Sequence, residues 1–303
     1  MKYLILGIAI FILIGQIAGM IFYHLPTKHT VPQGYQTIPR REEPPVEQSL
    51  HAEEKIDYSL QNDEVNVTFD KGKSWIHVPI EKEELFMGEY NGNKEDLIEN
   101  SYVFSEERIA FLYYHERGPG NKQVKILYSF DQGKNWEESV VTEHYPFLRF
   151  RKIAFLKDRF GYVIISGDRS MSQETSTVFL TYDGGKSWRE TNSSNITRLI
   201  ADGGFVDQET GFLLHGGVNP EKPELYVTHD SGSTWSEAEI RIPKRYHKIF
   251  VTAETPFKEG AQLALLVNQG PGGDYKGGKI KGKFLSEDLG KTWEFSMEVQ
   301  PHE

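Results

Sequence analysis

Four short segments of the sequence contain side chains that exchange protons, pair with charges or donate hydrogen bonds. They hold Tyr114, His115, Glu116 and Arg117; Asp168 and Arg169; His215; and Asn268 and Gln269. A carboxylate pair such as Glu116 and Asp168, placed on either side of a cleft, could hydrolyse a glycosidic bond. The chain has 44 acidic residues, so such pairs arise easily and are more typical of a solvated surface. The chemistry therefore depends on whether the fold brings these segments together.

The sequence does not indicate a metal or cofactor site. Its ten histidines show no paired ligand spacing, and the absence of cysteine excludes disulfides and thiolate ligands. Residues 270–283 are rich in glycine and hold four lysines. They lack the strand-to-helix context of a phosphate loop, so we interpret them as a hairpin between two strands.

Composition favours a folded, acidic, strand-rich domain. Aromatic residues make up 13% of the chain, and the net charge is −10. Residues 1–55 contain equal numbers of basic and acidic residues, so the remainder carries the negative charge. An acidic domain argues against sequence-independent binding to nucleic acid or to anionic lipid headgroups.

The N-terminal region predicts a single-pass membrane anchor followed by a spacer. Residues 3–23 are apolar apart from Gln16 and a few glycines, which is long enough to cross a bilayer. A cleaved signal peptide is the alternative, but no small-x-small site closes the run. We expect residues 1–23 to be a signal anchor with the C-terminal domain outside the cytoplasm. Residues 24–55 hold five prolines and predict an extended linker.

One eight-residue pattern recurs five times in residues 56–303 and includes every tryptophan of the chain. It reads hydroxyl residue, x, Asp, x, Gly, x, small polar residue, Trp. Its aspartate, glycine and tryptophan are Asp70, Gly72, Trp75; Asp131, Gly133, Trp136; Asp183, Gly185, Trp188; Asp230, Gly232, Trp235; and Asp288, Gly290, Trp293.

Each copy of the pattern predicts a closed β-hairpin. Alternating apolar residues precede most copies, as in a strand. The aspartate can accept hydrogen bonds from backbone amides of the turn, and the glycine permits a positive φ. The tryptophan would begin the returning strand and bury a large apolar face. Two further strand-like segments precede each of the last four copies, so one repeat reads as four antiparallel strands.

These motifs resemble the Asp-box, or BNR, repeat family, which includes sialidases, sortilin-type receptors, some glucan hydrolases and photosystem II assembly factors. The resemblance implies an all-β propeller with the boxes on its rim, away from any active site. We expect about five four-stranded blades, the first of them reduced because only residues 56–60 and 64–67 precede the first box as strands. A sixth blade would have to come from residues 80–100, which are too short for one. Alternatively, the first hairpin could complete an end blade and close the ring.

The resemblance also sets a test for catalysis. A sialidase-like enzyme would need three arginines for the substrate carboxylate, a Tyr-Glu nucleophile pair and an acidic acid/base residue. Arginines near inner strands are Arg117, Arg149, Arg151 and Arg169. The Arg241-Ile242-Pro243 segment follows the fourth box instead of preceding the first, so we interpret it as an ordinary strand end.

The sequence therefore leads to two hypotheses. In the first, the protein is a membrane-anchored extracytoplasmic module that binds a protein or a glycan without catalysis. Repeat equivalence places the four segments named at the outset on one face, where loops of several blades converge and propellers bind partners. In the alternative, the protein is a membrane-tethered, sialidase-like or other glycoside hydrolase.

Overall fold

The computed structural model describes residues 55–300, apart from residues 91, 117, 119–121, 158, 171–172 and 218. These residues belong to one compact unit, Ser49–Glu303. The predicted anchor and nearly all of the predicted linker lie outside the described residues. In the part that is described, no helix has the length and apolarity needed to span a membrane.

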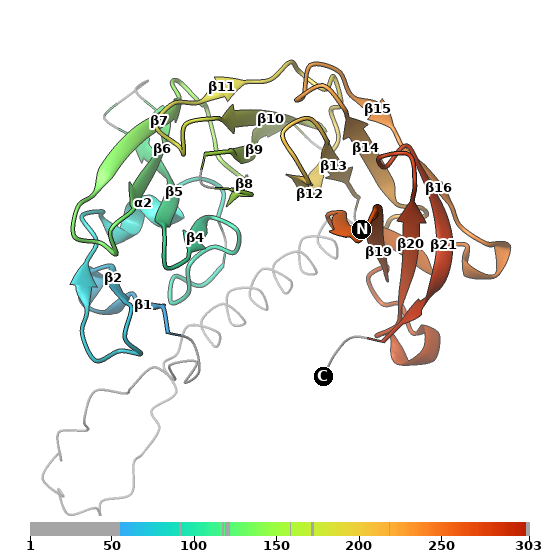
Figure 1. Ribbon diagram of the computed structural model, residues 1–303, viewed down its shortest axis with the longest axis horizontal. Coiled ribbons are helices and arrows are strands. Elements are labelled where there is room, and N and C mark those ends of the chain that lie inside the picture. The colour runs from blue at the N-terminus through green and yellow to red at the C-terminus, as the bar shows by residue number, and fades with distance from the viewer. Residues whose placement is uncertain are drawn as a thin grey trace, which may run out of the picture. The chain divides into compact units, whose positions relative to one another are not determined.

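The described chain is almost entirely β-structure, as predicted, and forms five sheets that we number in chain order (Figure 1). The first sheet contains β1 (Asp57–Ser59), β2 (Asn66–Thr68) and β3 (Ile76–His77). The second contains β4 (Tyr102–Phe104), β5 (Ile109–Glu116), β6 (Lys122–Ser129) and β7 (Glu137–Thr142). The third contains β8 (Phe150–Phe155), β9 (Gly161–Ser170), β10 (Gln173–Thr181) and β11 (Arg189–Glu190).

The fourth sheet contains β12 (Ile200–Phe205), β13 (Gly211–His215), β14 (Glu224–Thr228) and β15 (Ser236–Glu237). The fifth contains β16 (Glu239–Arg241), β17 (Phe250–Ala253), β18 (Phe257–Glu259), β19 (Gln262–Gln269), β20 (Lys281–Ser286) and β21 (Thr292–Val299). Among the described residues, helical structure is limited to α2 (Lys82–Phe86) and the one-turn segments Gln61–Asp63, Lys244–Tyr246 and Tyr275–Gly277.

The second, third and fourth sheets confirm the predicted order of four antiparallel strands per repeat. In each, the third and fourth strands flank an Asp-box. The first sheet is short, as expected, because no described strand precedes β1 in it. Residues 80–100 hold α2 and turns, and no strand is present among their described members.

The fifth sheet differs from the expected pattern. The segment after Trp235 continues into β16, which ends at Arg241 and pairs in parallel with β21 of the fifth sheet. The strand following the fourth box therefore extends into the next repeat. The sequence did not predict this crossing, because hydrophobic alternation does not specify which neighbour a short edge strand joins.

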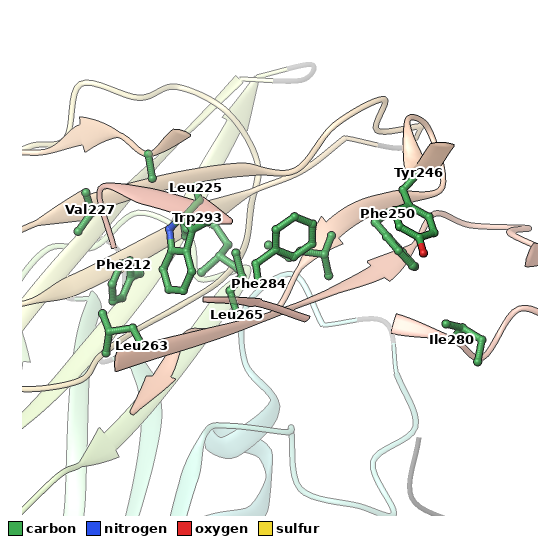
Figure 2. Close-up of a cluster of buried hydrophobic side chains, with 14 residues drawn as sticks. Phe212, Leu225, Val227, Tyr246, Phe250, Leu263, Leu265, Ile280, Phe284 and Trp293 are labelled. Carbon is green, nitrogen blue, oxygen red and sulfur yellow. The ribbon is translucent and has the colours of Figure 1, made fainter. Parts of the chain in front are cut away.

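Four apolar clusters lie between consecutive sheets and hold them in a propeller-like series. The cluster between the first and second sheets contains Val67 and Phe111, and that between the second and third contains Ile126 and Ile153. The next contains Ile164 and Leu213. Figure 2 shows the cluster between the fourth and fifth sheets, where Phe212, Leu225 and Val227 meet Leu265, Phe284 and Trp293. Full burial of one such side chain stabilises the fold by roughly 1.5–3 kcal/mol.

Candidate functional site

The Asp-boxes are structural turns, as illustrated by the second box. The Ser129 hydroxyl donates to Asp131 Oδ1 at 2.9 Å and accepts from the Gly133 amide at 2.9 Å. Asp131 Oδ1 accepts from the Asn135 amide at 2.8 Å, and its Oδ2 accepts from the Asn135 side chain at 2.6 Å. Gly133 has a φ of +77°, which glycine adopts without strain.

These hydrogen bonds stabilise the ionised carboxylate. The Asn135 side chain and then its backbone amide hold the pKa of Asp131 at about 2. Ser74 has the same effect on Asp70, whose pKa is also about 2. Since both carboxylate oxygens of these boxes are engaged within the turn, the box aspartates act as turn closures.

The four segments predicted to form a binding face do end at equivalent edges of their sheets. Ile200 and Phe250, which begin the first strands of the fourth and fifth sheets, pair with the last residues of the second strands, His215 and Gln269. In the third sheet, Phe150 pairs with Ser166, and β9 continues to Ser170. In the second sheet, β5 runs past the start of β4. We call this edge of the sheets the loop face, because the connections between sheets arrive there.

Tyr114 lies beneath the loop face and supports it. Its side chain is buried, and its hydroxyl donates to the carbonyl oxygens of Tyr145 and Pro146 at 2.7 and 2.9 Å. Burial raises the pKa of Tyr114 to about 12, so the hydroxyl remains a donor. The loop that it fixes presents Phe147, whose side chain remains 48% exposed. The ammonium group of Lys122 lies 4.5 Å from the centre of the Phe147 ring.

Gly167 holds the same loop close to the third sheet. A Cβ atom at Gly167 would lie 1.7 Å from the carbonyl oxygen of Phe147, so only glycine permits this approach. The role of Phe147 could not be predicted from the sequence, because an isolated phenylalanine in a loop carries no periodic signal.

His115 belongs to a polar cluster on the side of the second sheet that faces α2. Its Nδ1 contacts the carboxylate of Glu84 in α2. Tyr113 donates to the carboxylate of Glu138, which also accepts from Lys125 Nζ at 2.7 Å. Glu116, next along the chain, is exposed and lies 3.9 Å from Lys122 Nζ. The cluster thus contains a Tyr-Glu pair, although not one that the sequence analysis identified.

Arg149 and Glu174 connect the third and fourth sheets at the loop face. Arg149 Nε donates to Glu174 at 2.5 Å, and its Nη2 donates to the carbonyl oxygen of Ile200 at 3.0 Å. The Glu174 side chain is completely buried. Glu174 thus orients Arg149 within the third sheet, and Arg149 links this sheet to the fourth through Ile200.

The remaining predicted site residues are mostly engaged within their own sheets. His215 is buried, with Nδ1 donating to the carbonyl oxygen of Arg198 at 3.2 Å, and burial lowers its pKa. Asn268 donates to Glu254 at 2.7 Å. Gln269 donates to the carbonyl oxygens of Tyr275 and Ile280, both at 3.0 Å, and accepts from the Tyr275 amide. These contacts orient the loop between β19 and β20.

The described candidate arginines do not converge on one point. Arg151 is buried and donates to the carbonyl oxygens of Leu85, at 3.0 Å, and Met87, and burial lowers its pKa to about 10. Arg149 is bound to Glu174. Arg169 is exposed at the end of β9. Arg117 and the side chain of Asp168 lie outside what the structure describes.

A charged cluster that the sequence analysis missed joins the inner edges of three sheets. Lys152 Nζ donates to Asp202 at 2.6 Å, and the Thr255 hydroxyl donates to the other carboxylate oxygen of Asp202, also at 2.6 Å. The three residues come from β8, from β12 and from the segment after β17. They lie some 50 residues apart, which is the length of a repeat, and this spacing was the one signal in the sequence that could have linked them.

Within the described part of the chain, no group of three or more histidine or acidic side chains is arranged to hold a metal ion.

Comparisons with known proteins agree with the motif. The family model described as BNR/Asp-box repeat matches residues 127–138. No curated protein matches the chain by sequence. Solved structures with partial similarity include a family 117 glycoside hydrolase from Zobellia galactanivorans, with 10% identity over 66% of this chain and 68% of that one, at a TM-score of 0.40.

Two further similar structures are larger proteins. Trypanosoma rangeli sialidase shares 12% identity over 70% of this chain and 40% of its own, at a TM-score of 0.40. The family 74 xyloglucanase of Xanthomonas campestris shares 15% identity over 77% and 34%, at a TM-score of 0.41. The matched segment spans the second box, whose hydrogen bonds recur in the other four. The chain therefore carries the BNR/Asp-box repeat, and the part that is described folds as a series of antiparallel β-sheets.

Proposed function

We propose that this protein is a membrane-anchored, extracytoplasmic binding module that recognises a protein or a glycan through its loop face, without catalysis. Residues 1–23 serve as the signal anchor, and residues 24–55 as the spacer. The five sheets serve as five blades, the first of them reduced. Most of the predicted polar residues whose side chains are described support loops. The surface of these loops is therefore the part of the domain that would contact a partner.

The observation that carries this proposal is the presentation of Phe147. What distinguishes Phe147 from other exposed aromatic residues is that its loop is fixed by hydrogen bonds from Tyr114 and Lys122 and by the close approach of Gly167. A rigid aromatic side chain loses little conformational entropy on binding, so it is well suited as an anchor for a protein surface or a sugar ring.

Site-directed photocrosslinking tests this function in the full chain. A benzophenone amino acid replaces Phe147 in one variant and Phe257, which is 41% exposed on β18, in the matched control. We expect a discrete adduct in native membranes, or with immobilised cell-surface polysaccharide, from position 147 alone. Equal labelling at both positions, or none at 147, would reject the loop face as the binding surface.

The alternative, a tethered glycoside hydrolase, is favoured by one observation, the hydrogen-bonded pair of Tyr113 and Glu138. A tyrosine beside a carboxylate base can act as a nucleophile. If this pair were catalytic, the full chain would hydrolyse an aryl sialoside or glucoside, and Tyr113→Phe would lower kcat by orders of magnitude. Absence of turnover in the parent chain would remove this alternative.

The anchor has its own test. An epitope tag at the N-terminus remains attached to the full-length protein if residues 1–23 are an uncleaved anchor. Extraction with alkaline carbonate should then leave the tagged chain in the membrane pellet, and protease added to intact cells should degrade the domain. Loss of the tag during export would establish a cleaved signal peptide.

A further inference from the structure

Consecutive sheets contact each other by one repeating rule. In each pair of neighbouring sheets, the box loop of the later sheet packs against the segment that follows the box of the earlier sheet. This segment is the strand after that box or the residues just beyond it. Gly133 of the second box faces Ile76 in β3, and Gly232 of the fourth box faces Thr191 just after β11. In the fifth box, the carbonyl oxygen of Lys291 accepts from the Glu239 amide at 2.8 Å.

The contact between the second and third sheets shows the rule in atomic detail. Ser139 on β7 donates to the carbonyl oxygen of Gly185 in the third box at 2.6 Å. The indole of Trp188 in that box donates to the Ser139 hydroxyl at 3.2 Å. Ser139 stands three residues after Trp136. The equivalent residues Val78 and Ala238 are also buried, because the next box covers them.

The two terminal sheets lack this contact in the part of the chain that is described. Trp75 in the first box is 39% exposed, whereas Trp293 in the fifth box is fully buried against Phe212 (Figure 2). The position equivalent to Ser139 in the fifth sheet is the bulged segment of Ser296 and Met297, and both residues are exposed. Trp136, Trp188 and Trp235 are partly buried, so Trp75 and Trp293 are the two extremes of the five box tryptophans.

We propose that a second copy of this chain completes both ends, with Trp75 of each copy packing on Ser296 and Met297 of the other. The first box and the exposed segment are the two halves of a box-to-strand contact that the fold makes four times within the chain, and Trp188 and Trp293 take part in two of these contacts. Both halves are open at once in the same chain, and within the described residues no hydrogen bond, ion pair or core cluster joins the first sheet to the fifth.

The chemistry of the two surfaces matches. Ser296 provides the hydroxyl that Ser139 offers to Trp188, and the thioether of Met297 is a favourable neighbour for an indole ring. The first and last sheets are different surfaces, so their contact is heterologous. A heterologous contact that is made twice between two copies closes with two-fold symmetry and leaves no free end.

Crosslinking of the full chain in membranes tests this proposal, because the chain has no native cysteine that would react with the crosslinker. Lys73→Cys is made in a chain with one tag, and Ser296→Cys in a chain with another; the two are co-expressed and treated with a short bis-maleimide. We expect a covalent dimer that carries both tags. The control uses Lys134→Cys in place of Lys73→Cys. Lys134 has the same position in the second box, and the loop of that box already packs against the first sheet.

Further variants separate specific contact from chance collision. Trp75→Ala should lower the yield of the two-tag dimer at least tenfold, because a buried aromatic anchor dominates such an interface. Val140→Ala, which changes a residue equally exposed on β7, should leave the yield unchanged. A two-tag yield equal to that of the Lys134 control overturns the proposal. The proposal is also overturned if a chain that carries both cysteines forms only an intramolecular crosslink, because that result would show ring closure in a single copy.

Discussion

Two side-chain nitrogens of Arg149 donate hydrogen bonds to the carboxylate of Glu174, and the Glu174 side chain is completely buried. Removing one member of a buried ion pair leaves the other charge without compensation. We therefore expect Glu174→Ala to lower the free energy of unfolding by about 3–5 kcal/mol. Urea unfolding of the full chain measures this change.

The matched control for that variant is Glu239→Ala, which removes one member of the exposed pair of Arg241 and Glu239. Exposed pairs contribute little, so this variant should unfold at nearly the parent urea concentration. If both variants unfold alike, the buried pair of Arg149 and Glu174 does not stabilise the fold.

The sequence predicted the turns and the order of strands because both are local properties. The spacing within an Asp-box specifies the hydrogen bonds of Asp131 without reference to the rest of the chain. The position of Phe147 depends on Tyr114 and Gly167, which come from different sheets. The crossing of β16 and the exposure of Trp75 depend in the same way on which sheet lies next, and a sequence pattern does not contain that information.

The low pKa of Asp131 predicts a loss of stability in acid. Hydrogen bonds from Asn135 hold this pKa at about 2 in the folded protein, while an aspartate in an unfolded chain titrates near pH 3.9, at roughly its ordinary value. The stabilisation is therefore complete above about pH 4 and is lost as the pH falls toward 2. Asp131→Asn should unfold more easily at pH 6 and lose less stability between pH 4 and pH 2 than the parent chain. Parallel pH dependences would contradict this account.

His215 predicts a second pH dependence, at higher pH. Burial lowers its pKa, so the unfolded chain takes up a proton more readily than the folded one. Stability should decline as the pH falls below about 6.5, the ordinary pKa of histidine, and this decline should stop below the folded pKa. His215→Asn keeps a donor for the carbonyl oxygen of Arg198 and should flatten the curve between pH 7 and pH 5. His247→Asn, at an exposed site, should retain the parent curve.

Gly167 gives the sharpest test of the loop face, because its role is steric. A Cβ atom at this position would lie 1.7 Å from the carbonyl oxygen of Phe147 and 2.6 Å from its carbon, both in the backbone. Gly167→Ala must therefore push the loop outward, and forcing extra atoms into a packed site costs about 1–3 kcal/mol. Gly217→Ala is the control, since a Cβ atom there meets nothing within 4 Å.

The two glycine variants should differ in binding as well as in stability. With the benzophenone residue at position 147, Gly167→Ala should lose the adduct while Gly217→Ala retains it, because only the first displaces the ring. Hydrogen exchange should show faster opening of residues 144–148 in Gly167→Ala alone. If Gly167→Ala kept the adduct while exchange confirmed the displaced loop, the fixed placement of Phe147 would not be what the partner recognises.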